Sequence, residues 1–187
     1  MSATSTALRQ LPADLNRDAL PKHVAVIMDG NGRWAQKRKL PRMMGHHRGA
    51  DTLHDLVLCC KDWGIKSLTV YAFSTENWRR PEKEVNFLML LIEQMLRREM
   101  RFMEEEKVRL RVVGNVEVLP KALRKEVEES MERTAHFNSL NFNVATNYGG
   151  RQEILQACQA IATQVRAGHL APEEITAQHF EEMLNTA

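Results

Sequence analysis

The sequence predicts an α/β fold with a mostly parallel central sheet flanked by helices. Short runs rich in β-branched and apolar residues alternate with longer stretches of helical spacing, which is the pattern of stacked βα units. The chain has 187 residues, of which 43% are apolar and 27% charged, enough for one soluble domain with a substantial core. The four predicted strands are Val24–Met28, Ser67–Phe73, Val108–Val113 and Leu140–Ala145.

A crossover helix is expected at Gly49–Trp63, where apolar residues recur at helical spacing until Gly64. A second, long helix is predicted to begin after Pro81 and to run to about Lys107. Glu82 and Glu84 lie in its first turn, where negative charge suits the positive end of the helix dipole. Further helices are predicted at Pro120–Arg133, Arg151–Ala167 and Ala171–Leu184.

The middle of the long helix, Phe87–Ile92, is apolar around most of its circumference. Such a helix is buried on several sides. Two interpretations stay open at this point: a central helix packed all round, or a helix with one side on an apolar cavity or tunnel. In the second case Met89, Met95 and Met100 would form a deformable wall.

Charge and cysteine content limit the class of protein. The net charge of +2 is the difference between 26 basic and 24 acidic residues, so no nucleic-acid partner is expected and any anion site must be local. Cys59 and Cys60 are adjacent in a helical stretch, where a disulfide would be strained. With no secretory leader or membrane span, we expect a cytoplasmic protein with a polar tail at residues 1–20 and one domain at residues 21–187.

The first candidate site is the segment Asp29–Trp34, which directly follows the first predicted strand. Gly30 and Gly32 let consecutive backbone amides point toward one anion, and Arg33 adds a guanidinium. Open α/β sheets bind ligands at this end of their strands. The segment therefore fits a phosphate, although a glycine pair of this spacing also forms simple tight turns.

Basic residues gather after this loop, at Arg33, Arg42, His46, His47 and Arg48. Arginine forks match phosphate oxygens in pairs, and histidine can donate one more bond. A solvated basic face is the alternative, and we assign Lys37–Lys39 to it. Gly45 and Gly49 flank the expected start of the crossover helix, where they could bring the backbone close to an anion.

A second polar segment, Phe73–Pro81, follows the second strand and contains hydroxyls, a carboxamide and two arginines. An N-cap would explain Ser74 or Thr75, and Trp78 could be a core residue. Because parallel strands emit their loops at one edge of the sheet, we expect this segment to share a site with Asp29–Trp34. Asp29 would then hold Mg²⁺ through substrate oxygens and waters, or it would only cap the loop amides.

These segments resemble the successive motifs of the cis-prenyltransferase family, which includes undecaprenyl diphosphate synthases. His23–Trp34 resembles the family signature, and the later motifs follow it in order. They are Gly45-His46 with Gly49, Tyr71–Trp78 with Arg80-Pro81, and Asn147–Arg151. The similarity covers nearly the whole chain from about Leu20 onward.

The resemblance implies condensation of isopentenyl diphosphate with an allylic diphosphate such as farnesyl diphosphate, which gives a cis-polyprenyl diphosphate for a cell-wall lipid carrier. It also implies Mg²⁺ as cofactor, a homodimer in the full-length protein and at most peripheral membrane contact. Asp29 would hold the metal and assist ionisation, and Asn77 would take part in proton loss through the departing diphosphate or water. The substrate-binding residues would be Gly30, Asn31, Gly32, Arg33, Trp34, Arg42, His46, Ser74, Thr75, Glu76, Trp78 and Arg80.

One departure from the family pattern is that the family continues with an Arg-x-Gly-Gly-Glu segment, which these 187 residues do not contain. The resemblance assigns the isopentenyl diphosphate site, a second metal carboxylate and much of the dimer interface to that region. We therefore expect a C-terminally truncated chain with little or no condensing activity.

Two other classes of protein compete with an enzyme. A non-catalytic accessory subunit of a two-component cis-prenyltransferase would keep the fold, but such subunits usually lose the first-loop aspartate and arginines, and Asp29 and Arg33 are present. A phosphate-binding α/β domain with another substrate would not explain the ordered motifs. The absence of an Asp-Asp pair also disfavours the all-helical trans-prenyltransferases.

Overall fold

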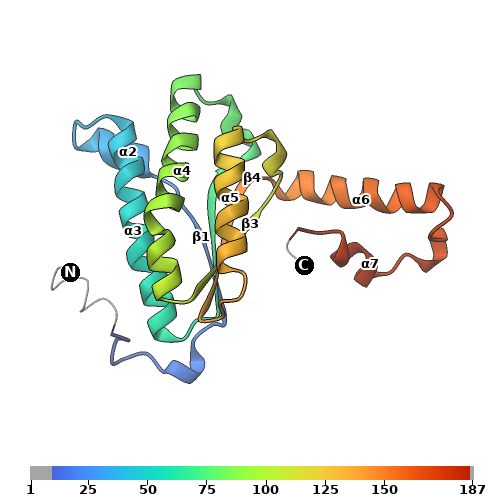
Figure 1. The fold of residues 1–187 in the computed structure, drawn as a ribbon, viewed down its shortest axis with the longest axis horizontal. Coiled ribbons are helices and arrows are strands. Elements are labelled where there is room, and N and C mark those ends of the chain that lie inside the picture. The colour runs from blue at the N-terminus through green and yellow to red at the C-terminus, as the bar shows by residue number, and fades with distance from the viewer. Residues whose placement is uncertain (1–9, 186–187) are drawn as a thin grey trace.

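The computed structural model describes residues 10–185 and contains a four-stranded, fully parallel sheet (Figure 1). The predicted α/β class and all four predicted strands are confirmed, although the last strand continues to Tyr148 rather than ending at Ala145. The spatial order is β1-β2-β4-β3. The strands are β1 (His23–Ile27), β2 (Ser67–Ser74), β3 (Val108–Val113) and β4 (Leu140–Tyr148).

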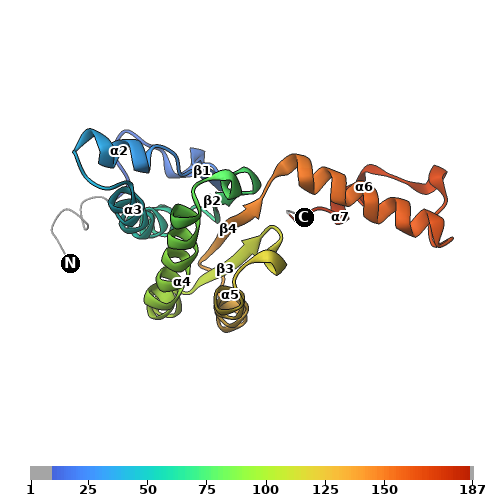
Figure 2. The ribbon, with the colours of Figure 1, turned by 90° about the horizontal axis from the view of Figure 1, so that it is seen from above.

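Three helices cover one face of the sheet, namely α3 (Arg42–Trp63), α4 (Glu82–Glu105) and α5 (Lys121–Thr134) (Figures 1 and 2). Alternate residues of the strands point into this layer, as a pleated sheet requires. The buried strand residues include Leu68, Val70, Leu110, Phe142 and Val144. The predicted long helix thus lies in the middle of the packed layer, between α3 and α5.

The opposite face of the sheet carries polar side chains. Thr69 sits at its centre, where its Oγ1 accepts a hydrogen bond from Asn143 Nδ2 at 3.1 Å. The same hydroxyl lies 2.8 Å from His23 Nε2. These bonds connect β1, β2 and β4 through polar side chains, although Ile27 and Tyr71 are also exposed on this face. The hydrophobic core lies on the helical side.

Helix α3 begins at Arg42, not at Gly49 as predicted, and is preceded by α2 (Asn31–Lys37), which the sequence indicated only as a loop. Gly45 and Gly49 therefore lie inside a helix. A Cβ on Gly45 would overlap the carbonyl oxygen of Asn31, and one on Gly49 would lie 2.5 Å from Asn31 Nδ2. These glycines allow α2 and α3 to pack closely, which replaces the expected role of bringing the backbone to an anion.

The last described helices project away from the sheet (Figures 1 and 2). Helix α6 (Gly150–Arg166) agrees with the prediction, but the single helix predicted at Ala171–Leu184 is wrong. A 3₁₀ turn, η4 (Pro172–Glu174), is followed by the separate helix α7 (Ala177–Glu182). Thr176 interrupts the helix because its side chain caps α7, with Oγ1 accepting from His179 N at 3.3 Å.

Of the predicted polar tail at residues 1–20, the first nine residues lie outside the described part. The rest includes the 3₁₀ turn η1 (Arg17–Ala19), whose Arg17 Nη1 donates to the carbonyl of Asp62 at 3.4 Å. Cys59 and Cys60 form no disulfide, and burial, with the neighbouring Cys59, raises the pKa of Cys60 to about 11. None of the described helices combines the length and apolar character needed to span a bilayer.

Candidate functional site

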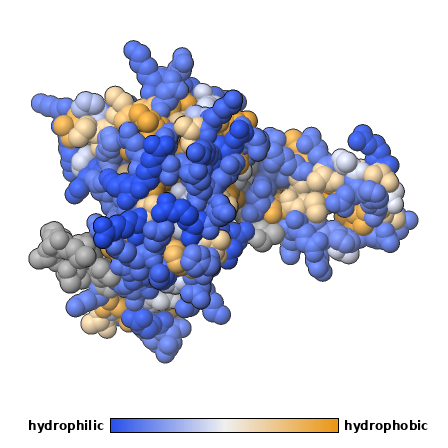
Figure 3. All heavy atoms as spheres, in the orientation of Figure 1, coloured by the Kyte–Doolittle hydropathy of each residue, from blue (hydrophilic) through white to orange (hydrophobic). Residues whose placement is uncertain are grey.

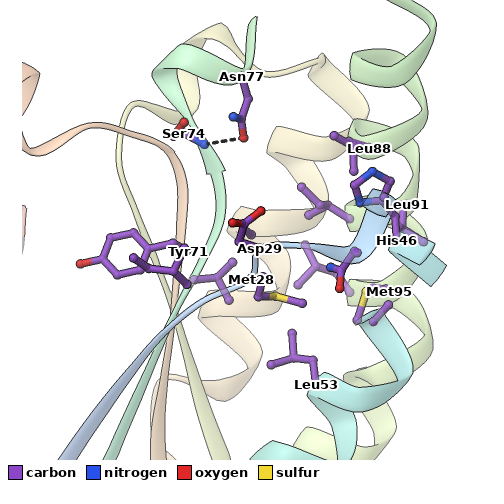
Figure 4. A pocket seen from close by; sticks show the side chains of 18 of the residues that line it. Met28, Asp29, His46, Leu53, Tyr71, Ser74, Asn77, Leu88, Leu91 and Met95 are labelled. Atoms are coloured by element: carbon purple, nitrogen blue, oxygen red, sulfur yellow. Dashed lines mark hydrogen bonds between the residues drawn. The ribbon is translucent and has the colours of Figure 1, made fainter. Parts of the chain in front are cut away.

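A cavity of about 390 Å³ opens at the carboxyl end of β1 and β2 and extends between α3, α4 and the sheet. Figure 4 shows the Asp29 carboxylate and the Ser74–Asn77 pair at one end of it, and Met28, Leu53 and Met95 further in. The expectation that two strand ends share one site is confirmed. The predicted site residues on its wall are Asp29, Gly30, Asn31, Gly32, Arg33, Arg42, His46, Ser74, Asn77 and Arg80.

The loop between β1 and α2 turns at Gly30, whose φ of +87° is a conformation that favours glycine. Asp29 accepts hydrogen bonds there from the Gly30 backbone amide and from Arg33 Nη2, the latter at 2.7 Å. The carboxylate thus caps the loop, as one alternative proposed, yet it stays exposed and faces the cavity. The ion pair with Arg33 is solvated, so a ligand can replace it at small cost.

Gly32 has a steric reason to lack a side chain. A Cβ at this position would lie 2.8 Å from Cζ of Arg42. The guanidinium of Arg42 therefore rests against the backbone of the first loop, at the start of α3. This close approach places a cation beside the loop amides, the arrangement that phosphate oxygens require.

Glu84, at the start of α4, is a residue whose role the sequence analysis missed. One of its oxygens, Oε1, lies 3.1 Å from Arg80 Nη1, 3.4 Å from His46 Nε2 and 3.5 Å from Arg42 Nη2. The only sequence signal was an acidic residue in the first turn of a helix. Glu84 instead connects three predicted substrate-binding residues from three segments of the chain.

Burial and neighbouring charges set the protonation of this cluster. Burial lowers the pKa of His46 below its ordinary value, and this outweighs the raising effect of the Glu84 carboxylate. Burial alone would raise the pKa of Glu84, but the hydrogen bond and charge of Arg42 and the charge of Arg80 lower it. At neutral pH, His46 is therefore neutral and Glu84 ionised.

The second segment forms the 3₁₀ turn η2 (Thr75–Arg79), with Ser74 at its N-cap as predicted, and α4 begins just after it at Glu82. Asn77 folds back so that its Oδ1 accepts from Ser74 N at 3.1 Å, which fixes the carboxamide at the cavity wall. Thr75, Glu76 and Trp78 belong to the same turn but are not on the cavity wall. Their predicted contacts with substrate stay predictions.

Trp78 and Thr75 contact the end of β4 instead. Trp78 Nε1 donates to Asn147 Oδ1 at 2.7 Å, and Nδ2 of Asn147 donates to the carbonyl of Asn115 at 2.8 Å. Asn147 has a φ of +50°, and a Cβ on Gly149 would lie 2.6 Å from Thr75 Oγ1. The Asn147–Arg151 motif therefore holds the η2 turn and the loop after β3 in place.

The remaining predicted residue of the first loop, Trp34, does not reach this cavity. Its ring stacks under the guanidinium of Arg38, 4.3 Å from the ring centroid. It borders a second hollow next to Arg48 and Thr52, on the other side of the Asp29–Asn31 backbone.

The body of the cavity is apolar. Helix α4 contributes most of its wall, which confirms the interpretation that one side of this helix lines a cavity. Of the three predicted wall methionines only Met95 lies there; Met89 and Met100 are buried in the core instead, because they project from other sides of α4. The apolar lining includes Leu53, Val57, Leu88, Leu91, Ile92, Met95, Leu96, Met103, Phe142 and Val144.

One polar pair interrupts this apolar body. Glu99 lines the cavity, and its Oε2 lies 2.6 Å from Nδ1 of His54 on α3. Glu99 follows Glu84 by fifteen residues, which is about 22 Å along the axis of α4. The pair therefore lies at the end of the cavity opposite the mouth.

The described residues contain no group of three or more His, Cys, Asp or Glu side chains able to hold a metal ion. Asp29 is the one carboxylate on the first loop. This donor set fits a Mg²⁺ ion that takes one protein ligand and completes its shell with ligand oxygens and water.

The chain is similar to known proteins in both sequence and structure. Residues 27–187 match the family model described as putative undecaprenyl diphosphate synthase. The chain is 48% identical over 177 residues to an isoprenyl transferase of Prochlorococcus marinus, covering 95% of the chain and 66% of that relative. It is 43% identical over 179 residues to the (2E,6E)-farnesyl-diphosphate-specific ditrans,polycis-undecaprenyl-diphosphate synthase of Shewanella oneidensis, covering 96% of the chain and 65% of that relative.

A solved structure is similar as well. Lavandulyl diphosphate synthase from Lavandula x intermedia, in complex with dimethylallyl diphosphate, aligns with a TM-score of 0.85 and 31% identity over 89% of this chain and 71% of that one. The chain thus spans about two thirds of the length of the relatives it matches. With a family match over residues 27–187 and a parallel sheet that carries the matching motifs at one edge, the chain belongs to the undecaprenyl diphosphate synthase family.

Proposed function

We propose that the cavity binds an allylic diphosphate and that the protein takes part in its condensation with isopentenyl diphosphate to a cis-polyprenyl diphosphate. The observation that carries this proposal is the division of one cavity into a cationic mouth and an apolar body. A prenyl diphosphate has the same division, with a charged head and a hydrocarbon tail. The names of the relatives, which include a farnesyl-diphosphate-specific synthase, agree with this substrate class.

In this proposal the amides of Gly30 to Gly32, with Arg33, Arg42 and Arg80, bind the head group. Neutral His46 adds a donor without a further charge. The prenyl tail lies along Leu88, Leu91 and Met95, where its burial displaces water.

Condensation breaks the allylic C–O bond, forms a new C–C bond to isopentenyl diphosphate and removes one proton. Asp29 would hold Mg²⁺, and this ion would neutralise negative charge on the departing diphosphate. Asn77 is fixed at the cavity wall by Ser74, and its carboxamide would orient the diphosphate or water that accepts the proton. A cytoplasmic location and assembly as a homodimer also belong to this proposal.

The test is incubation with farnesyl diphosphate, labelled isopentenyl diphosphate and Mg²⁺, with analysis of the products by chain length. The same assay is applied to a chimera that continues into the remaining sequence of the Prochlorococcus marinus relative. Binding of farnesyl diphosphate to the 187-residue chain is measured separately by calorimetry. Product from the chimera together with binding by the chain supports the proposal; absence of both overturns it.

The accessory-subunit alternative makes a different prediction. Such a subunit would raise the activity of a separate catalytic chain without needing its own Asp29. The accessory subunit would be favoured over the enzyme if the chimera forms no product alone, raises product formation by a separate catalytic chain, and does so equally after Asp29→Ala.

A further inference from the structure

The connection between α2 and α3 is a solvent-exposed tip, of which the proposed reaction uses only Arg42. Nine consecutive residues, Gln36–Met44, are exposed, and we call this segment the basic tip. Backbone hydrogen bonds hold the tip to the end of α2: Lys39, with a φ of +58°, donates from its N to the carbonyl of Gln36 at 3.0 Å, and Leu40 N donates to the carbonyl of Ala35 at 3.0 Å.

Positive charge is concentrated around the basic tip. Residues 30–50 contain no Asp or Glu, although the whole chain carries a net charge of only +2. No ion pair joins Lys37, Arg38 or Lys39 to an acidic residue of the described part. The six basic residues of this span are Arg33, Lys37, Arg38, Lys39, Arg42 and Arg48.

Large apolar side chains are exposed among these charges. Leu40 is 40% exposed, Met43 44% and Met44 50%, and Trp34, on α2, is 37% exposed under Arg38. Figure 3 shows hydrophobic and hydrophilic side chains side by side at the α2 end of the molecule. Leu40 in the turn and Met43 and Met44 in the first turn of α3 are exposed apolar side chains rimmed by charge, a pattern that marks interaction surfaces.

We propose that the basic tip is a membrane-docking surface that places Leu40, Met43 and Met44 among the head groups of an anionic bilayer. The charge complementarity selects this occupant, because cationic side chains around an apolar centre match anionic lipid head groups over acyl chains. Trp34 suits the interface between water and hydrocarbon. Arg42 joins the tip to the cavity mouth, so docking would bring that mouth to the lipid surface.

This docking does not depend on catalysis, so it is tested by binding alone. Cosedimentation is measured with vesicles of phosphatidylcholine and with vesicles that also contain phosphatidylglycerol. The chain should bind the anionic vesicles and lose binding as salt rises. Lys37→Gln, Arg38→Gln and Lys39→Gln together should weaken binding by about a hundredfold, since each basic residue contributes roughly fivefold near an anionic surface.

A charge-matched control is available on α5 and α6. Lys121→Gln, Lys125→Gln and Arg166→Gln remove the same charge from exposed positions, and this variant should keep most of the binding. Met43→Ser with Met44→Ser keeps all charges and should weaken binding by about tenfold. Equal losses in the two triple variants, or no binding by the unmodified chain, would overturn the proposal.

Fluorescence quenching does not rely on the folding of these variants. Lipids with brominated acyl chains should quench the fluorescence of Trp34, so Trp34→Phe should abolish most of the quenching. Trp63→Phe, at the far end of α3, should leave the quenching unchanged. Sedimentation without lipid tests another occupant. If Met43→Ser with Met44→Ser breaks up an oligomer in the absence of lipid, the tip is a protein interface and the membrane proposal is wrong.

Discussion

The mouth of the cavity and its apolar body are built from the same two helices, α3 and α4, but from different turns of each helix. At the mouth, Arg42 and His46 of α3 meet Glu84 of α4. In the body, Leu53 and Val57 of α3 face Leu91 and Met95 of α4. One pair of helices therefore provides both a charged site and a hydrocarbon-sized space.

The mouth would bind the charged head of the proposed ligand through ion pairs, whereas the body would bind its hydrocarbon tail through apolar burial. The cations of the mouth already have partners, since Arg33 pairs with Asp29, and Arg42 and Arg80 pair with Glu84. In the proposed complex a diphosphate would replace these partners, so single substitutions should have large effects there. The body only loses water, and its contribution is spread over many contacts of similar size.

The largest expected effect is that of Asp29→Ala in an active chimera. Turnover should fall by roughly a thousandfold, because charge on the departing group is no longer neutralised, while the affinity for farnesyl diphosphate is largely retained. Steady-state kinetics and calorimetry separate these quantities. Asp51→Ala, an exposed carboxylate paired with Arg48 and Arg98, is the control and should leave turnover unchanged.

Gly45→Ala tests whether the mouth depends on close packing of α2 against α3. The new methyl group would overlap the Asn31 carbonyl, so the free energy of unfolding should fall by about 1–3 kcal/mol. Gly150→Ala is the control, because its Cβ would meet only the Tyr148 hydroxyl at 3.9 Å. Equal urea midpoints for Gly45→Ala and the parent chain would contradict the packing role.

Glu99→Leu tests the polar pair at the far end of the body. Removal of the Glu99 carboxylate extends the apolar wall, so prenyl diphosphates longer than farnesyl diphosphate should bind about fivefold more tightly. The affinity for shorter ones should not change. Affinities across a series of chain lengths measure this. Glu93 lies on the same helix, pairs with Arg97 and is not on the cavity wall. Glu93→Leu is therefore the control and should leave the affinities unchanged across the series.

The smallest effect concerns pH and His46. Its pKa is lowered from 6.5 in the folded state, so below pH 6.5 the unfolded chain binds more protons and stability falls. The slope from this residue is at most about 1.4 kcal/mol per pH unit. Glu84 adds a further loss only below 4.5, because its folded pKa is also lowered.

Urea unfolding at a series of pH values checks this prediction. His46→Gln should flatten the pH dependence of the unfolding free energy just below pH 6.5. Substitution of the exposed His169 by Gln should leave that dependence unchanged. An unchanged slope in His46→Gln would show that His46 is not the group that titrates.

The sequence predicted the strands and the shared site because both follow from local pattern and from the direction of parallel strands. It did not predict the start of α3, since the need for glycine at Gly45 and Gly49 arises from contact with Asn31 on another helix. Glu84 was missed for the same reason: its three partners come from separate segments. Nor could apolar content tell which methionines of α4 face the cavity and which face the core.

Asn147 has a consequence for how the cavity can adapt. Its side chain holds both the η2 turn and the loop after β3, while its backbone is part of the end of β4. The sheet side of the cavity is thus cross-linked by hydrogen bonds, and α3 and α4 are joined by polar pairs both at the mouth, through Glu84, and further along, at His54 and Glu99. A bulkier tail would therefore be accommodated between these fixed points, where flexible side chains such as Met95 line the wall.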